Sequence, residues 1–125
     1  NIVDVTSILG KTAFVTPSNT SENILLANAA ASGKVFKVNQ IVVANVDGTS
    51  AADATVAYNT ADGGTADGGT SYTIISTVSV PADASIIAVD KNTSLYLEED
   101  RSIVVTSGTA SDLAYTISYE ELDDA

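Results

Sequence analysis

The sequence predicts an all-β fold, a single antiparallel β-sandwich or jelly-roll-like domain. Three observations lead to this prediction. Apolar and polar residues alternate with a period of two in short segments rich in Val, Ile, Thr and Tyr. Turn-forming residues separate these segments, and helical periodicity is missing between them. A length of 125 residues fits one domain whose core needs no disulfide or metal.

The expected strands follow one another at a regular cadence along the chain. They lie at residues 12–16, 35–46, 54–58, 72–80, 85–89, 94–97, 102–106 and 113–120. Around them we expect three regions: an N-terminal strand or arm at 1–11, the sandwich at 12–121 and an acidic C-terminal tail at 122–125.

The strand at 113–120 shows the alternation most clearly. One set of its residues is predicted to face the core: Leu113, Tyr115, Ile117 and Tyr119. The run at 35–46 differs because it is apolar on both faces around Ile41 to Ala44. It is expected either to lie centrally in its sheet or to have one face covered by another subunit.

The segment at 21–31 has features of both helix and strand. Ser21 would suit a helix N-cap, three alanines favour helix, and Gly33 would end one. Because the surrounding sequence is typical of strands, we favour a strand at 24–27 followed by a loop.

Composition excludes several classes of function. The net charge of −11 argues against binding to nucleic acid and to anionic membranes, and it permits docking onto a positively charged protein. The chain has neither Cys nor His, which removes disulfides, thiol nucleophiles and histidine acid–base chemistry. The adjacent carboxylates at 98–100 fall in an expected turn. We therefore predict no catalytic residue, metal ligand or cofactor, and hence no enzyme.

The stretch TADGGTADGGT at 60–70 repeats five residues and joins two expected strands. Asp62 and Asp67 could offer oxygens to calcium, but the intervening Gly, Thr and Ala do not supply the ligands that a calcium loop needs. A long, flexible hairpin tip is the preferred interpretation.

Four segments carry a resemblance to known proteins. They read GKVFKVNQIVVANVDGT at 33–49, STVSVPADA at 76–84, LYLEEDRSI at 95–103 and ISYEE at 117–121. Across residues 12–121 the pattern resembles small virion structural proteins of tailed bacteriophages, especially those of marine cyanophages. The resemblance implies a β-sandwich that forms part of a virion, assembled in the host cytoplasm, without catalytic activity.

Within this class we expect a capsid decoration protein on the head surface. The alternatives are a neck, tail or fibre accessory, a receptor- or glycan-binding module, and a filament subunit that exchanges its N-terminal strand. The expected partners are the major capsid protein or tail components, together with further copies of the chain. Residues expected to contact partners lie at both ends: Ile2, Val3, Val5, Glu120, Glu121, Asp123 and Asp124.

Overall fold

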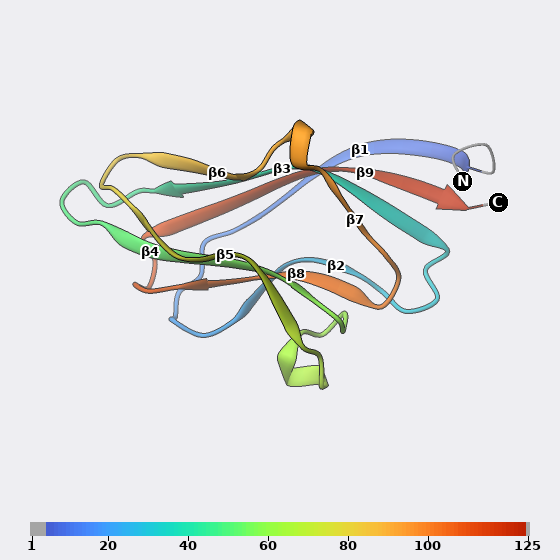
Figure 1. Ribbon diagram of the computed structural model, residues 1–125, viewed down its shortest axis with the longest axis horizontal. Coiled ribbons are helices and arrows are strands. Elements are labelled where there is room, and N and C mark those ends of the chain that lie inside the picture. The colour runs from blue at the N-terminus through green and yellow to red at the C-terminus, as the bar shows by residue number, and fades with distance from the viewer. Residues whose placement is uncertain (1–4, 125) are drawn as a thin grey trace.

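Two antiparallel sheets lie face to face in the computed structural model, which describes residues 5–124 and the side chains of residues 8–123 (Figure 1). The described residues form nine strands: β1 (Val5–Val15), β2 (Asn23–Asn28), β3 (Lys34–Asn45), β4 (Ala52–Asn59), β5 (Ser71–Val80), β6 (Ser85–Val89), β7 (Leu95–Leu97), β8 (Arg101–Ser107) and β9 (Leu113–Asp124). The only helical turns in this part of the chain are the 3₁₀ turns η2 (Thr65–Asp67) and η3 (Lys91–Thr93). The predicted all-β sandwich is confirmed.

The strand order is that of a jelly roll. One sheet has five strands in the order β1-β9-β3-β6, with β7 also paired to β3, and the other has the order β2-β8-β4-β5. Early strands therefore pair with late ones in a nested series: β1 with β9, β2 with β8, β3 with β6 and β7, and β4 with β5. This nesting is the pattern of a long hairpin rolled over on itself.

The segment that combined helix and strand features is a strand, β2. Its residues alternate between the core and the surface except at a bulge after Ile24, and Leu26 lies in the core. The strand pairs with β8, so its backbone groups are satisfied by a neighbour and need no helical ladder. The preferred prediction of a strand at 24–27 is confirmed.

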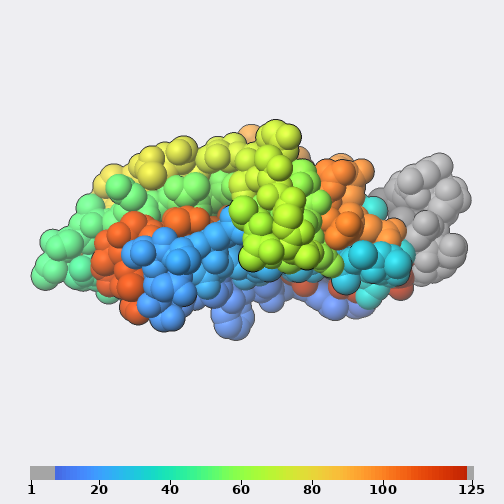
Figure 2. Space-filling model, turned by 90° about the horizontal axis from the view of Figure 1, so that it is seen from below, coloured from blue at the N-terminus to red at the C-terminus, as the bar shows by residue number. Residues whose placement is uncertain are grey.

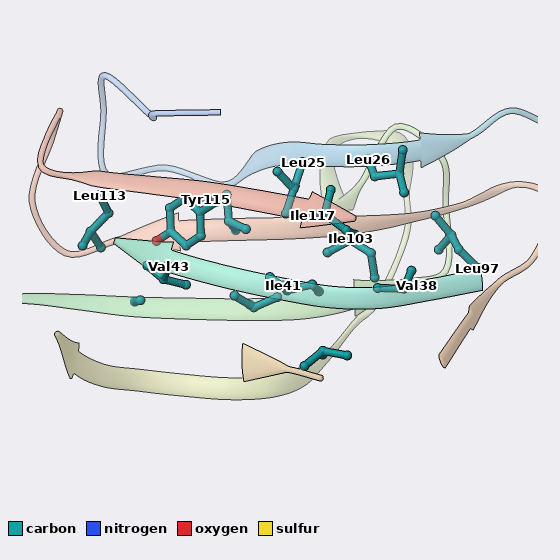
Figure 3. Close-up of a cluster of buried hydrophobic side chains, with 14 of the residues drawn as sticks. Leu25, Leu26, Val38, Ile41, Val43, Leu97, Ile103, Leu113, Tyr115 and Ile117 are labelled. Carbon is teal, nitrogen blue, oxygen red and sulfur yellow. The ribbon is translucent and has the colours of Figure 1, made fainter. Parts of the chain in front are cut away.

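The core lies between the sheets and is built from aliphatic side chains of both (Figure 3). Leu113, Tyr115 and Ile117 of β9 are 0% exposed, as the alternation in that strand predicted. Tyr119 packs at the edge of this cluster with its ring 5.1 Å from that of Phe36. The Tyr115 hydroxyl lies 3.0 Å from Ser107 Oγ and donates to the Thr106 carbonyl at 3.2 Å, so a buried polar group is satisfied.

Strand β3 lies centrally, as one of the two predictions for it required. It pairs with β9 along one edge and with β6 and β7 along the other. Val38, Ile41 and Val43 point into the core and are 0% exposed. The outward-facing Val35 and Val42 are only half-buried. The core therefore explains the apolar residues on the inner face of β3. The apolar residues on its outer face are only half-buried by the described chain.

The two chain ends belong to one pair of strands. Strand β1 runs without interruption across the expected boundary at residues 11 and 12, and it pairs with β9 from Val15 to Val5. Residues 122–124, expected as a tail, are the last residues of β9. In Figure 1 the start of β1 and the end of β9 lie side by side at one end of the molecule.

The repeat at 60–70 is not a free hairpin tip, and that expectation is corrected. Glu22 accepts hydrogen bonds from the Thr65 N–H at 2.9 Å and from the Thr65 hydroxyl at 2.8 Å. The Ser102 hydroxyl donates to the Ala61 carbonyl at 2.7 Å, and the buried Asn59 amide donates to Thr65 Oγ1 at 3.1 Å. These contacts draw the loop back onto the four-stranded sheet, where it forms the yellow-green projection in Figure 2.

Candidate interaction surface

The outer faces of the two sheets differ in how far their side chains are buried. On the four-stranded sheet four residues of β4 and β8 point away from the core and are nonetheless buried, and the 60–70 loop bonds two of them, Asn59 and Ser102. Exposed fractions there are small: Ala57 4%, Asn59 0%, Ser102 0% and Val104 2%. On the five-stranded sheet no outward-facing residue with a described side chain is buried. We call this outer surface of β1, β9, β3, β6 and β7 the five-stranded face.

An uncharged row crosses the five-stranded face from edge to edge. The strand registers place Phe14 of β1 beside Thr116 of β9, Thr116 beside Val42 of β3, and Val42 beside Ile87 of β6. Phe14 is 77% exposed and Ile87 is 60% exposed, whereas the two middle residues are half-buried. The row therefore has a large exposed apolar side chain at each edge of the sheet, and the two less exposed side chains lie between them.

A second row lies nearer the chain termini. Gly10 of β1 is opposite Glu120 of β9, Glu120 is opposite Lys37 of β3, and Lys37 is opposite Tyr96 of β7. Asn39 also donates to the Glu120 carboxylate at 3.3 Å. Among the described outward side chains of these strands, Lys37 and Glu120 are the charged ones. The described side chains of the five-stranded face thus carry no net charge, in a chain of −11.

A third row is apolar. Ile8 lies opposite Leu122, and Leu122 lies opposite Val35. Ile8 is 53% exposed and the other two are half-buried. Large exposed apolar side chains that recur on one sheet face are typical of a surface that meets another protein.

The expected contact residues at the C-terminus fall on opposite faces of β9. Glu120 belongs to the five-stranded face. Glu121 points the other way, has a side chain only 7% exposed, and forms ion pairs with Lys34 at 2.6 Å and Lys11 at 3.0 Å. These pairs link β9 to β3 and β1, which places Glu121 among the contacts that hold the chain's own sheet together.

The ion pairs shift the protonation of this cluster. The hydrogen bonds from Lys34 and then Lys11 lower the pKa of the Glu121 carboxyl below its ordinary value. The same contact with Glu121 raises the pKa of Lys34. Glu121 and Lys34 are therefore both charged near neutral pH.

The remaining expected contact residues lie close to the paired ends of β1 and β9. Val5 pairs with Asp124 through the backbone, and Asp123 is half-buried and opposite Lys34. The side chains of Val5 and Asp124 lie outside the described part of the structure, as do Ile2 and Val3 altogether. Their role as contact residues stays a prediction.

Sequence reasoning missed Phe14, Lys37 and Ile87 as surface residues of interest. The signal for Phe14 was present, because Ala13 and Val15 beside it are the half-buried, core-packed residues of the strand. Lys37 and Ile87 needed the strand register, which joins segments far apart in the sequence.

Two further features of residues 5–124 concern metal-ligating side chains and membrane-spanning helices. In that range no group of three or more acidic side chains could hold a metal ion. Asp62, a candidate calcium ligand, instead accepts the Ala30 N–H at 3.3 Å. A helix long and apolar enough to cross a membrane is likewise not found among these residues.

By sequence, the chain matches no protein-family profile and no curated protein. By structure, it is similar to a protein of the infectious bursal disease virus particle, with a TM-score of 0.51, 8% identity, and coverage of 96% of this chain and 32% of that one. A Bacillus endospore appendage protein, described as a disulfide-linked pilus, gives a TM-score of 0.49 and 12% identity, with coverage of 95% and 90%. A nucleoplasmin-like N-terminal domain from Drosophila gives 0.44 and 14%, with coverage of 96% and 93%. The chain spans about a third of the viral protein, and what the two share is the all-β fold.

Proposed function

We propose that this protein is a non-enzymatic structural protein of a tailed-phage virion, a capsid decoration protein on the head surface. The observation that carries the proposal is the contrast between the two outer faces. One is partly covered by the chain's own 60–70 loop, which contacts the buried Asn59 and Ser102, whereas the other has no buried outward residue among its described side chains and is edged by Phe14 and Ile87. A surface of this kind serves contact with proteins.

The acidic remainder of the surface supplies a second mode of contact. Acidic residues exceed basic ones by 16 to 5, which keeps the free protein soluble and suits docking onto basic patches between capsid subunits. The resemblance to small virion proteins adds support for the phage setting. Groups suited to acid–base or nucleophilic chemistry are sparse, because the chain has no His and no Cys.

Particles isolated with the protein and imaged by cryo-electron microscopy test this assignment. Density for the sandwich at repeated positions on the head supports it. Density restricted to the neck, tail or fibre replaces it with an accessory role there. If the protein alone forms filaments linked by exchanged strands, that result would favour the alternative function, a filament subunit that exchanges its N-terminal strand.

Docking in solution gives a second test. Purified protein should co-sediment with capsids that lack it at low salt and be released at about 1 M salt, where the screening length falls to about 3 Å. Binding that is indifferent to salt would contradict docking through acidic groups.

A further inference from the structure

We infer that the partner covering the five-stranded face is a second copy of this chain, held face to face about a two-fold axis. The inference rests on the proposed function only in that the chain's role is contact with proteins, and it names the partner and the residues that meet. Its geometry follows from the three rows of side chains on that face.

Charge favours a second copy at this face and disfavours it elsewhere. Two chains of −11 each repel when their acidic surfaces approach. Among its described side chains the five-stranded face offers one cation, Lys37, and one anion, Glu120, side by side. Two copies can therefore meet there without a net repulsion between the contacting surfaces.

The same two residues make the face self-complementary. In a two-fold contact the same patch is used on both copies, so residue i meets j and j meets i. An axis along the strands, between β9 and β3, exchanges β9 with β3. It therefore brings Glu120 of each copy over Lys37 of the other.

That axis also exchanges the edges of the sheet, β1 with β6 and β7. It sets Phe14 of one copy against Ile87 of the other, two large exposed apolar groups. It also sets Gly10, beside which a Cβ would find nothing within 4 Å, against Tyr96, which is 56% exposed. The open site at Gly10 thus faces the projecting ring of Tyr96. In this arrangement the strands of the two packed sheets are aligned to within about 30°, the usual angle for aligned sheets.

The size of the face suits a small dimer interface. Four strands at about 4.8 Å spacing and roughly nine residues at about 3.3 Å each give about 20 Å by 30 Å. That is roughly 600 Å² for each copy and about 1,200 Å² in total, the lower limit of stable protein interfaces. A dimer with a Kd in the micromolar range is the expected result.

Sedimentation equilibrium of the purified chain tests the inference. Wild type should be dimeric at about 100 μM. Lys37→Glu and Glu120→Lys should each weaken the dimer at least tenfold, because each places like charges opposite one another across the interface. An equimolar mixture of the two variants should recover dimers, since the carboxylate introduced at position 37 of one copy then meets the ammonium group introduced at position 120 of the other. Repulsion inside each chain is unchanged by mixing, so recovery reports a contact between chains.

A matched control moves the same charge off the five-stranded face. Ser18→Glu with Thr20→Glu shifts the net charge by −2 and Glu99→Lys shifts it by +2, at exposed positions outside the strands. Both should dimerise as wild type does. Gly10→Gln fills the open site opposite Tyr96 and should also weaken the dimer at least tenfold, with an unchanged circular dichroism spectrum.

A wild type that stays monomeric at about 100 μM overturns the inference, and so does a mixture of the two charge variants that remains monomeric. These results are separate from those for the proposed function. Head density in the virion together with a monomer in solution would leave the virion role standing, whereas a dimer without virion density would leave the interface standing.

Discussion

Glu22 and Thr65 are 43 residues apart in the chain, yet the carboxylate of the first accepts both the N–H and the hydroxyl of the second. The Ser71 hydroxyl donates to the same carboxylate at 3.3 Å. One side chain before β2 thus bonds both the middle of the 60–70 loop and the first residue of β5, which follows that loop.

Glu22→Ala should release this loop. The loss of hydrogen bonds to a charged acceptor is expected to lower the free energy of unfolding by about 1 to 2 kcal/mol. Protease cleavage within 60–70 should become faster. Urea denaturation and limited proteolysis measure the two effects, with the exposed Glu99→Ala as the control. Equal cleavage of both variants would contradict the assigned role of Glu22.

Two glycines of the repeat should differ in their tolerance of alanine. Gly64 and Gly68 have φ of 74° and 83°, so alanine at either position is strained by about 1 kcal/mol. A Cβ at Gly64 would also lie 2.6 Å from Glu22 Oε1, whereas at Gly68 it would meet nothing within 4 Å. Gly64→Ala should therefore have the lower melting temperature of the two. A larger drop for Gly68→Ala would show that the loop is arranged differently.

Tyr115→Phe should destabilise the core although it removes only one oxygen. Burial raises the pKa of this hydroxyl, which is neutral and bonded to Ser107 and Thr106. Its loss leaves the buried Ser107 hydroxyl without that partner and should lower the free energy of unfolding by about 1 to 3 kcal/mol. Tyr72→Phe, at a 63% exposed position, is the control and should change it by less than about 0.5 kcal/mol.

Acid should weaken the attachment of β1 to the rest of the sheet. The pKa of Glu121 is lower in the folded chain than in the unfolded chain, where it is about 4.3. Its contribution to stability is therefore complete above that value and is lost as the pH falls through the folded pKa.

Glu121→Gln provides the comparison for this pH effect. Melting temperatures of wild type and Glu121→Gln should differ most near neutral pH and converge in strong acid, below the folded pKa of Glu121. A constant difference across that range would mean that the ion pairs with Lys34 and Lys11 do not contribute as proposed.

The fold could be predicted largely from local pattern, because the alternation of Leu113, Tyr115 and Ile117 is itself the consequence of one buried sheet face. The surface could be predicted only in part. Glu120 and Glu121 look equivalent in sequence, and alternation separates them only when β9 is known to continue past residue 120. The Lys37–Glu120 and Phe14–Ile87 relationships depend on strand register, which long-range pairing sets. The loop at 60–70 was wrongly predicted to be a flexible tip because Glu22, the residue that anchors it, lies far away in the chain.

The folded repeat also bears on how an assembly of this chain would grow. A sandwich with two bare faces would stack without end, copy upon copy, as an open fibre. Here the 60–70 loop covers part of the four-stranded sheet, where Asn59 and Ser102 are buried, so a pair formed through the five-stranded face would present that loop on each of its outward surfaces.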